Sequence, residues 1–245
     1  MAAKILNTAC SNGDMDRVQD LLNSDWKPSQ DELDTALQKA TWGGYATIAA
    51  LLLSKGARIT SLAFSGAAYN KDPTIFQEFL NYGWDINSTE FGDPALRLVV
   101  DDEICVRWFL EHGADPNQQN DKGMTPLATA ALRPSINILE LLIIHGAKLD
   151  PQALLNAISR RGNGGVPVMR YLIDQGIDIN APSRQYCSPL HYAVSVAGVD
   201  RVQILLDKGA DRSIRNILGE TPAEMAKSRM AQSEEAMKVY EILSK

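Results

Sequence analysis

A phrase ending in glycine recurs along the chain and constrains the fold more than any other feature. It consists of several aliphatic or aromatic residues, two variable residues, a glycine and a small residue, often followed by Asp and Asn. The successive glycines are 27, 30, 33, 30 and 33 residues apart. Such a period indicates a chain built from small repeated units. The glycines are Gly56, Gly83, Gly113, Gly146, Gly176 and Gly209.

A second phrase precedes these glycines by about 20 residues. It is clearest as SPLHYA from Ser188, and it recurs as TPLATA from Thr125 and TPAEMA from Thr221. A Ser or Thr oxygen can accept a hydrogen bond from an unpaired N–H at a helix start. The proline that follows suits the first helical position, where no N–H is needed. Small apolar residues then recur at helical spacing, so each phrase predicts the start of a thin helix.

A second helix in each repeat carries larger aliphatic residues, such as Val202, Leu205 and Leu206. The glycine after it can take the left-handed conformation that ends a helix. A helix pair of this size cannot bury its own apolar face, so it must stack on its neighbours.

The two phrases, held in phase at roughly 33 residues, resemble those of the ankyrin repeat family. The resemblance covers essentially the whole chain, although the Thr-Pro start is missing from Asp31 to Asn87. It implies an all-α ankyrin-repeat solenoid, a single domain over 1–245, with about eight helix-turn-helix repeats and degenerate end caps. The expected repeats are 1–30, 31–61, 62–90, 91–120, 121–150, 151–183, 184–216 and 217–245.

Charge, cysteines and apolar stretches restrict partners and location. The formal net charge of -6 disfavours nucleic acid as a partner. The three cysteines, Cys10, Cys105 and Cys187, are widely spaced, which is typical of a reducing compartment. The N-terminus lacks a secretory pattern, and apolar stretches such as 138–144 fall far short of the ~20 residues that span a bilayer. We therefore expect a cytoplasmic or nuclear protein without a membrane partner.

No set of residues in the sequence predicts catalysis or a metal site. His112, His145 and His191 all occupy positions that recur structurally in such repeats. Cys187 and His191 are four residues apart, but two ligands alone are a weak zinc signal. The glycine-rich segment 161–165 lacks the lysine and the Ser/Thr of a P-loop, and it reads as a flexible insertion. We expect no enzyme activity, no metal and no cofactor.

The family resemblance implies that a partner binds the concave face, which is made of turn tips and the exposed ends of the first helices. Residues 1–120 carry a net charge of -8 and residues 121–245 carry +2. This face should therefore bind a protein or extended peptide of mixed charge, with Trp, Tyr and Arg side chains as anchors. We expect a monomeric scaffold or adaptor. The candidate partner-binding residues are Asp31, Glu32, Trp42, Tyr69, Asp101, Asp102, Arg133, Arg160, Arg161, Arg184 and Tyr186.

Three alternatives stay open at this point. An enzyme or accessory protein could bind a small molecule in a pocket between Trp42, Tyr69, Asp101 and Arg133, which would require an enclosed cavity. The C-terminal arginines could bind nucleic acid, although a net charge of +2 gives little phosphate affinity. Trp42 could also pack against a neighbouring repeat and bind nothing.

Overall fold

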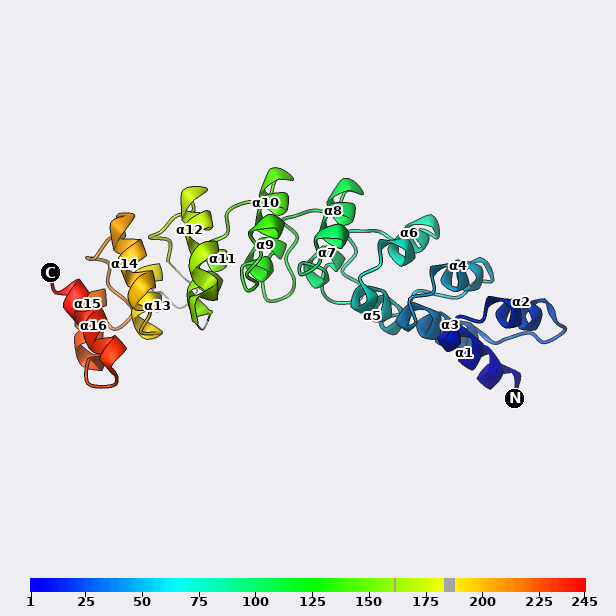
Figure 1. Ribbon diagram of the computed structural model, residues 1–245. Helices are drawn as coiled ribbons and strands as arrows, with labels where there is room; N and C mark the ends of the chain where they lie inside the picture. The colour runs from blue at the N-terminus through cyan, green and yellow to red at the C-terminus, as the bar shows by residue number, and fades with distance from the viewer. Residues whose placement is uncertain (161, 183–187) are drawn as a thin grey trace. The chain divides into compact units, whose positions relative to one another are not determined.

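The computed structural model describes residues 1–160, 162–182 and 188–245, which form 16 α-helices and one short 3-10 helix (Figure 1). The α-helices follow one another in pairs, as the sequence predicts, and no strand occurs in these ranges. The chain divides into two compact units, Met1–Asp121 (unit 1) and Lys122–Lys245 (unit 2).

Unit 1 contains four helix pairs. Its helices are α1 (Ala2–Asn12), α2 (Met15–Asn23), α3 (Gln30–Trp42), α4 (Ala46–Ser54), α5 (Ser61–Asn70), α6 (Pro73–Asn81), α7 (Ala95–Leu98) and α8 (Glu103–Glu111).

Unit 2 contains four further pairs. Its helices are α9 (Pro126–Ala130), α10 (Ile136–Ile144), α11 (Pro151–Ser159), α12 (Val166–Asp174), α13 (Pro189–Ser195), α14 (Val199–Asp207), α15 (Pro222–Arg229) and α16 (Glu234–Leu243). The 3-10 helix η1 (Gly162–Gly165) leads directly into α12, where the sequence predicts a flexible insertion.

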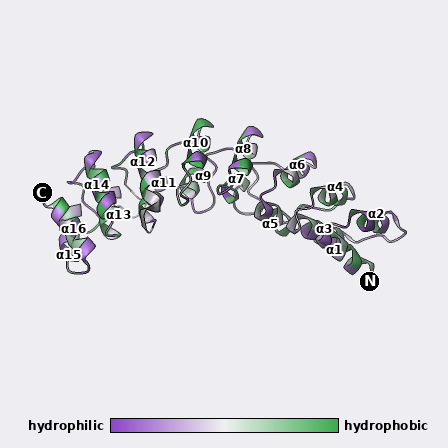
Figure 2. Ribbon diagram, viewed as in Figure 1, coloured by the Kyte–Doolittle hydropathy of each residue, from purple (hydrophilic) through white to green (hydrophobic). Residues whose placement is uncertain are grey.

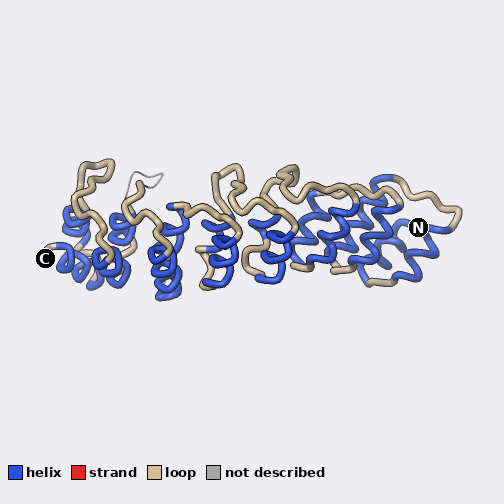
Figure 3. The backbone as a smooth tube through the Cα atoms, turned by 90° about the horizontal axis from the view of Figure 1, so that it is seen from above, coloured by secondary structure: helices blue, strands red, loops and turns tan. Residues whose placement is uncertain are grey.

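Within each unit, helices of the same kind pack side by side (Figures 1 and 3). The first helices of the pairs form one layer: α3 lies between α1 and α5, and α11 and α13 lie between α9 and α15. The second helices form the other layer, with α2, α4, α6 and α8 in unit 1 and α10, α12, α14 and α16 in unit 2. Apolar residues occur on both helices of each pair (Figure 2), and those between the layers are buried.

Six of the eight second helices, α4, α6, α8, α10, α12 and α14, are followed by a turn that contains the recurring glycine. All six glycines have φ between +86° and +93°, and an added Cβ would meet no other atom. The left-handed backbone, and not crowding, therefore accounts for glycine at these positions.

Helix starts keep their caps where the Thr-Pro phrase is missing. Ser29 accepts a hydrogen bond from the N–H of Glu32, whose carboxylate accepts one from the N–H of Ser29 in return. Thr60 caps α5 by accepting from the N–H of Ala63. The chemistry of the helix start thus survives in these repeats without the proline.

An aromatic cluster lies in the core of unit 1 around α5, α6 and α8, and the sequence patterns do not predict it. The ring of Phe76 lies 4.8 Å from that of Phe109, 5.8 Å from that of Trp84 and 5.9 Å from that of Phe64, measured between centroids. The buried indole N–H of Trp84 has no hydrogen-bond acceptor. Its neighbours are aromatic rings, whose faces can accept a weak N–H contact.

Asp34 ties the second helix pair to the turn that follows it. Its buried carboxylate accepts hydrogen bonds from the backbone N–H of Arg58 at 2.7 Å, from the Arg58 guanidinium at 2.6 and 2.9 Å, and from Gln30. Burial acts to raise the pKa of Asp34, but these hydrogen bonds outweigh it and lower the pKa below its ordinary value of 3.8. The charged form is therefore the one that the fold stabilises.

We predict that Asp34→Asn lowers the free energy of unfolding by about 1 to 2 kcal/mol at pH 7, because hydrogen bonds to a charged acceptor are lost. A lowered folded-state pKa means that this contribution is complete above pH 3.8 and declines as the pH falls below it. Urea denaturation of both proteins at pH 7 and pH 3 measures the difference. If the two free energies of unfolding differ as much at pH 3 as at pH 7, the carboxylate does not have this role.

Candidate functional site

Eight of the eleven predicted partner-binding residues lie in the described part of the chain, six in unit 1 and two in unit 2. Asp31, Glu32, Trp42, Tyr69, Asp101 and Asp102 belong to unit 1, and Arg133 and Arg160 belong to unit 2. Arg161, Arg184 and Tyr186 lie outside the described residues.

Trp42 and Tyr69 lie against each other on the exposed side of the first helices in unit 1. Their ring centroids are 5.3 Å apart, and the ring planes are inclined by 34°. Trp42 is 43% exposed and Tyr69 is 71% exposed. We call this pair the aromatic plate, because the two rings contact each other and both residues remain exposed to solvent.

One edge of Trp42 is fixed on the neighbouring helix. Its indole N–H donates a hydrogen bond of 3.1 Å to the carbonyl of Leu62 on α5. A Cβ at Gly66 would lie 2.8 Å from Cδ1 of Trp42, so the glycine permits this close approach. The side chain of Asn70 donates to the carbonyls of Thr41 and Trp42 and holds the end of α3. Trp42 therefore packs on its neighbour with one edge and stays open to solvent elsewhere.

The acidic candidates in unit 1 also have local partners. Glu32 belongs to the capping box of α3, and Asp102 accepts a hydrogen bond of 2.8 Å from the N–H of Cys105. Asp101 forms an ion pair of 2.8 Å with Lys71. The side chain of Asp31 is 96% exposed and lies 3.7 Å from the guanidinium of Arg58. Asp31 is thus the most accessible of these carboxylates.

The two arginine candidates in unit 2 differ in their surroundings. Arg160 is half-buried, and its guanidinium donates to the carbonyl of Leu132, which follows the end of α9. Arg229 donates in the same way to the carbonyl of Ser195 at the end of α13. Arg133 is exposed, and its backbone N–H donates a hydrogen bond to the carbonyl of Ala130. The guanidinium of Arg160 therefore serves the fold, which leaves Arg133 the freer surface cation.

The histidines all contact backbone carbonyls. Buried His191 has its ring nitrogens 2.9 Å from the Ser188 hydroxyl and 2.9 Å from the carbonyl of Glu220. His112 and His145 each place Nδ1 within 2.8 Å of the carbonyl four residues earlier. Their geometry fits the structural positions assigned to them from the sequence.

Sequence reasoning missed one exposed apolar feature in unit 2. Ile217 and Leu218 are 69% and 76% exposed at the tip of a turn. The turn is fixed by Asn216, whose side-chain oxygen accepts from the N–H groups of Leu218 and Glu220. The sequence does contain a signal for this feature. Ile217 and Leu218 precede Gly219, whereas the charged residues Asp121 and Lys122 precede the matching glycine of another repeat.

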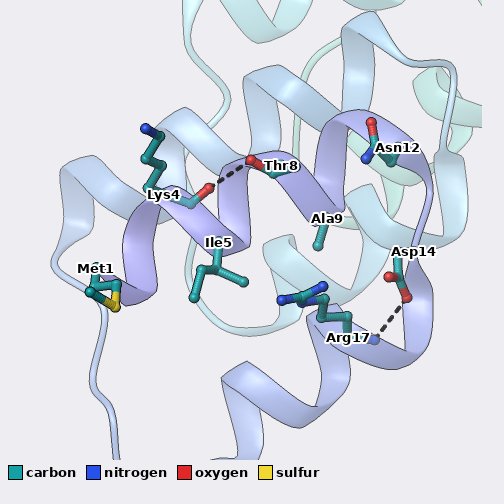
Figure 4. Close-up of a pocket in the computed structure, with 8 residues that line it drawn as sticks. All are labelled: Met1, Lys4, Ile5, Thr8, Ala9, Asn12, Asp14 and Arg17. Atoms are coloured by element: carbon teal, nitrogen blue, oxygen red, sulfur yellow. Dashed lines mark hydrogen bonds between the residues drawn. The ribbon is translucent and has the colours of Figure 1, made fainter.

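Three cavities can be described within the units. One of about 260 Å³ lies between α1 and α2, lined by residues such as Ile5 and Arg17 (Figure 4). Unit 1 has another of about 360 Å³ beside Trp84 and Glu90, and unit 2 has one of about 340 Å³ beside Ile214. Neither the aromatic plate nor Asp101 nor Arg133 lines any of the three. These cavities therefore do not support the alternative of a small-molecule pocket between Trp42, Tyr69, Asp101 and Arg133.

The described residues offer neither a metal-binding cluster nor a helix that could span a membrane. They contain no cluster of three or more His, Cys, Asp or Glu side chains suited to a metal ion. In the same ranges, no helix has the length and apolar character needed to cross a bilayer.

Comparison with known families and structures agrees with this architecture. A family model described as "Ankyrin repeats (3 copies)" matches residues 64–153, and one described as "Ankyrin repeat" matches residues 185–217. A solved structure, the ankyrin repeat domain of Bcl-3, a member of the IkappaB protein family, is similar with a TM-score of 0.54. That likeness covers 98% of each chain at 24% identity, so it bears on the fold alone. The predicted fold is confirmed.

The relatives found by sequence are much longer proteins. Ankyrin repeat protein FPV018 of fowlpox virus is 28% identical over 65% of this chain and 27% of its own length. Human neurogenic locus notch homolog protein 1 is 29% identical over 63% of this chain and 6% of its own length. Ankyrin repeat protein nuc-2 of Neurospora crassa is 32% identical over 49% and 12%. The chain thus spans 27% or less of each of these relatives.

We predict that Gly66→Ala lowers the free energy of unfolding by about 1 to 2 kcal/mol, although alanine is the better helix former. The added methyl group would push Trp42 off α5. Ser65→Ala, on the exposed side of the same helix, should change stability by less than about 0.5 kcal/mol. Urea denaturation measures both, and equal stabilities would show that Trp42 does not depend on Gly66.

We predict that Arg160→Ala lowers the free energy of unfolding by about 1 kcal/mol, because the carbonyl of Leu132 loses its donor. The matched change Arg133→Ala should have an effect below about 0.5 kcal/mol. Thermal and urea unfolding of the two variants compare them directly. If Arg133→Ala is the more damaging change, the capping role of Arg160 is wrong.

Proposed function

The chain belongs to the ankyrin repeat family, and from this premise we propose that it is a non-catalytic protein-interaction module whose partner binds the exposed side of the first helices in unit 1. Ankyrin repeats generally mediate contacts between proteins, and the fold is typically a scaffold without catalytic groups. The binding surface and its anchor residues are particular to this chain.

The aromatic plate carries the proposal. Large aromatic side chains are normally buried, and exposed Trp and Tyr residues are enriched among the residues that dominate binding energy. Trp42 and Tyr69 remain 43% and 71% exposed although they contact each other. The Leu62 carbonyl holds the indole in place, so binding would cost little side-chain entropy.

The surrounding charge supports a partner segment that is basic where it meets unit 1. Unit 1 has 9 basic and 18 acidic residues, a net charge of -9, and unit 2 has 15 basic and 12 acidic residues, a net charge of +3. Exposed Asp31 lies on α3, the helix that ends at Trp42. We propose that Arg133 serves unit 2 as a separate contact for acidic groups of a partner, in a cytoplasmic or nuclear setting.

The test compares proteins captured by the wild-type chain and by a Trp42→Leu/Tyr69→Leu variant from the same cell extract, quantified by mass spectrometry. Tyr82→Leu is the matched control, because Tyr82 is also a half-exposed aromatic residue but follows a second helix. We expect proteins that wild type and the control retain and that the double variant loses. Equal retention by all three would move the binding surface elsewhere, and an empty wild-type capture would argue against an interaction module.

A further inference from the structure

Resting on the proposed function, we propose that the aromatic plate binds a cationic side chain, a lysine or an arginine, supplied by a basic segment of the partner. The ammonium or guanidinium group of that side chain meets the rings of Trp42 and Tyr69.

The geometry of the plate suits a cation. A lysine or arginine head group is attracted to the face of a tryptophan or tyrosine ring within about 6 Å of its centroid. The indole N–H of Trp42 is already used by the Leu62 carbonyl, so the ring surface, not its polar edge, is what the plate offers. The two ring centroids are 5.3 Å apart, so one cation beside the pair can lie within about 6 Å of both centroids.

The plate also lies where backbone dipoles favour positive charge. Trp42 is the last residue of α3, and Tyr69 is the residue before the last of α5. The C-terminal end of a helix carries a partial negative charge, which attracts cations. The backbone of Trp42 and of Tyr69 lies at two such ends, although the Trp42 indole reaches back to the Leu62 carbonyl in the first turn of α5.

The charge of unit 1 acts in the same direction. Its net charge is -9, and several of its own cations are already held by acidic neighbours. Arg58 pairs with Asp34, Lys71 with Asp101, Arg97 with Asp93, and Arg107 with Glu103. An incoming basic segment therefore meets an excess of negative charge that speeds association and orients the segment.

Other occupants fit the plate less well. An aliphatic side chain binds best in a pocket, and neither of the two unit 1 cavities described above includes Trp42 or Tyr69. An acidic segment would be repelled by the net charge of unit 1. Lys39, one turn before Trp42 on α3, is the cation of this helix end, and it should compete with an incoming one.

The experiment titrates the full chain, labelled with ¹⁵N, with three acetylated and amidated nonapeptides. In these peptides glycine alternates with lysine, glutamine or glutamate. The indole N–H resonance of Trp42, identified by its loss in Trp42→Phe, reports contact at the plate. We expect the lysine peptide to shift this resonance and to bind more weakly as salt rises, while the glutamine and glutamate peptides leave it unchanged.

Variants separate the rings from the general charge. Trp42→Leu/Tyr69→Leu should weaken lysine-peptide binding at least about fivefold, whereas Tyr69→Phe and Tyr82→Leu should keep it. Lys39→Gln should strengthen it. Thermal unfolding of each variant confirms that it is folded, and Tyr69→Leu alone, at a site that is 71% exposed, serves if the double variant is not.

Binding of the lysine peptide that is unchanged in the double variant would overturn the inference, because the affinity would then come from net charge alone. So would a Trp42 resonance that does not respond to the lysine peptide. If the capture experiment still shows proteins lost with the plate, the interaction module stands and only the cation is wrong. If the capture is empty while the lysine peptide binds at the plate, the inference of a cation stands and the interaction module is wrong.

Discussion

The burial of apolar surface between neighbouring helix pairs is the constraint on which the rest of the structure depends. A single pair of helices of 4 to 13 residues has too little apolar surface to fold alone, so each pair is stable only against its neighbours. This explains why the first helices are rich in alanine and why residues such as Ala40, Ala67 and Ala157 are fully buried. It also explains the position of Gly66, where the absence of a side chain lets α3 and α5 approach until Trp42 rests on the backbone of α5.

The same stacking settles where the polar backbone groups at helix ends find partners. The last carbonyls of a helix receive no hydrogen bond from an N–H of the same helix, so they need a donor from elsewhere. Here the donor often comes from the following pair: Asn70 serves the end of α3, Arg160 the end of α9 and Arg229 the end of α13. An arginine near a helix end in this chain can therefore be part of the fold, however strongly its residue type suggests binding.

The fold could be predicted because its signals are local and repeated. A cap residue, a proline and a glycine each act over one turn of helix, and their period identifies the family. The Asp34–Arg58 contact and the aromatic cluster around Phe76 could not be predicted in this way, because they join residues that are far apart in the sequence. For the site, residue type alone selected Trp42 and Tyr69, which lie 27 residues apart, but their contact depends on Gly66 and on the Leu62 carbonyl. Residue type likewise could not separate Arg160, held by a carbonyl, from exposed Arg133, and it passed over Ile217 and Leu218, whose exposure only the turn around Asn216 reveals.

These observations indicate how a repeat chain divides its residues between fold and binding. Positions between layers repeat because stacking requires it, so they carry little information about a partner. What distinguishes one such chain from another is the small set of large apolar and aromatic side chains that stay exposed when the helix pairs stack. Trp42 and Tyr69 meet that description most fully, because one edge of the pair is fixed by the neighbouring helix while the ring surfaces remain open. A rigid aromatic surface at two helix ends, within a unit of net charge -9, has a physical reason to select a cation over other groups.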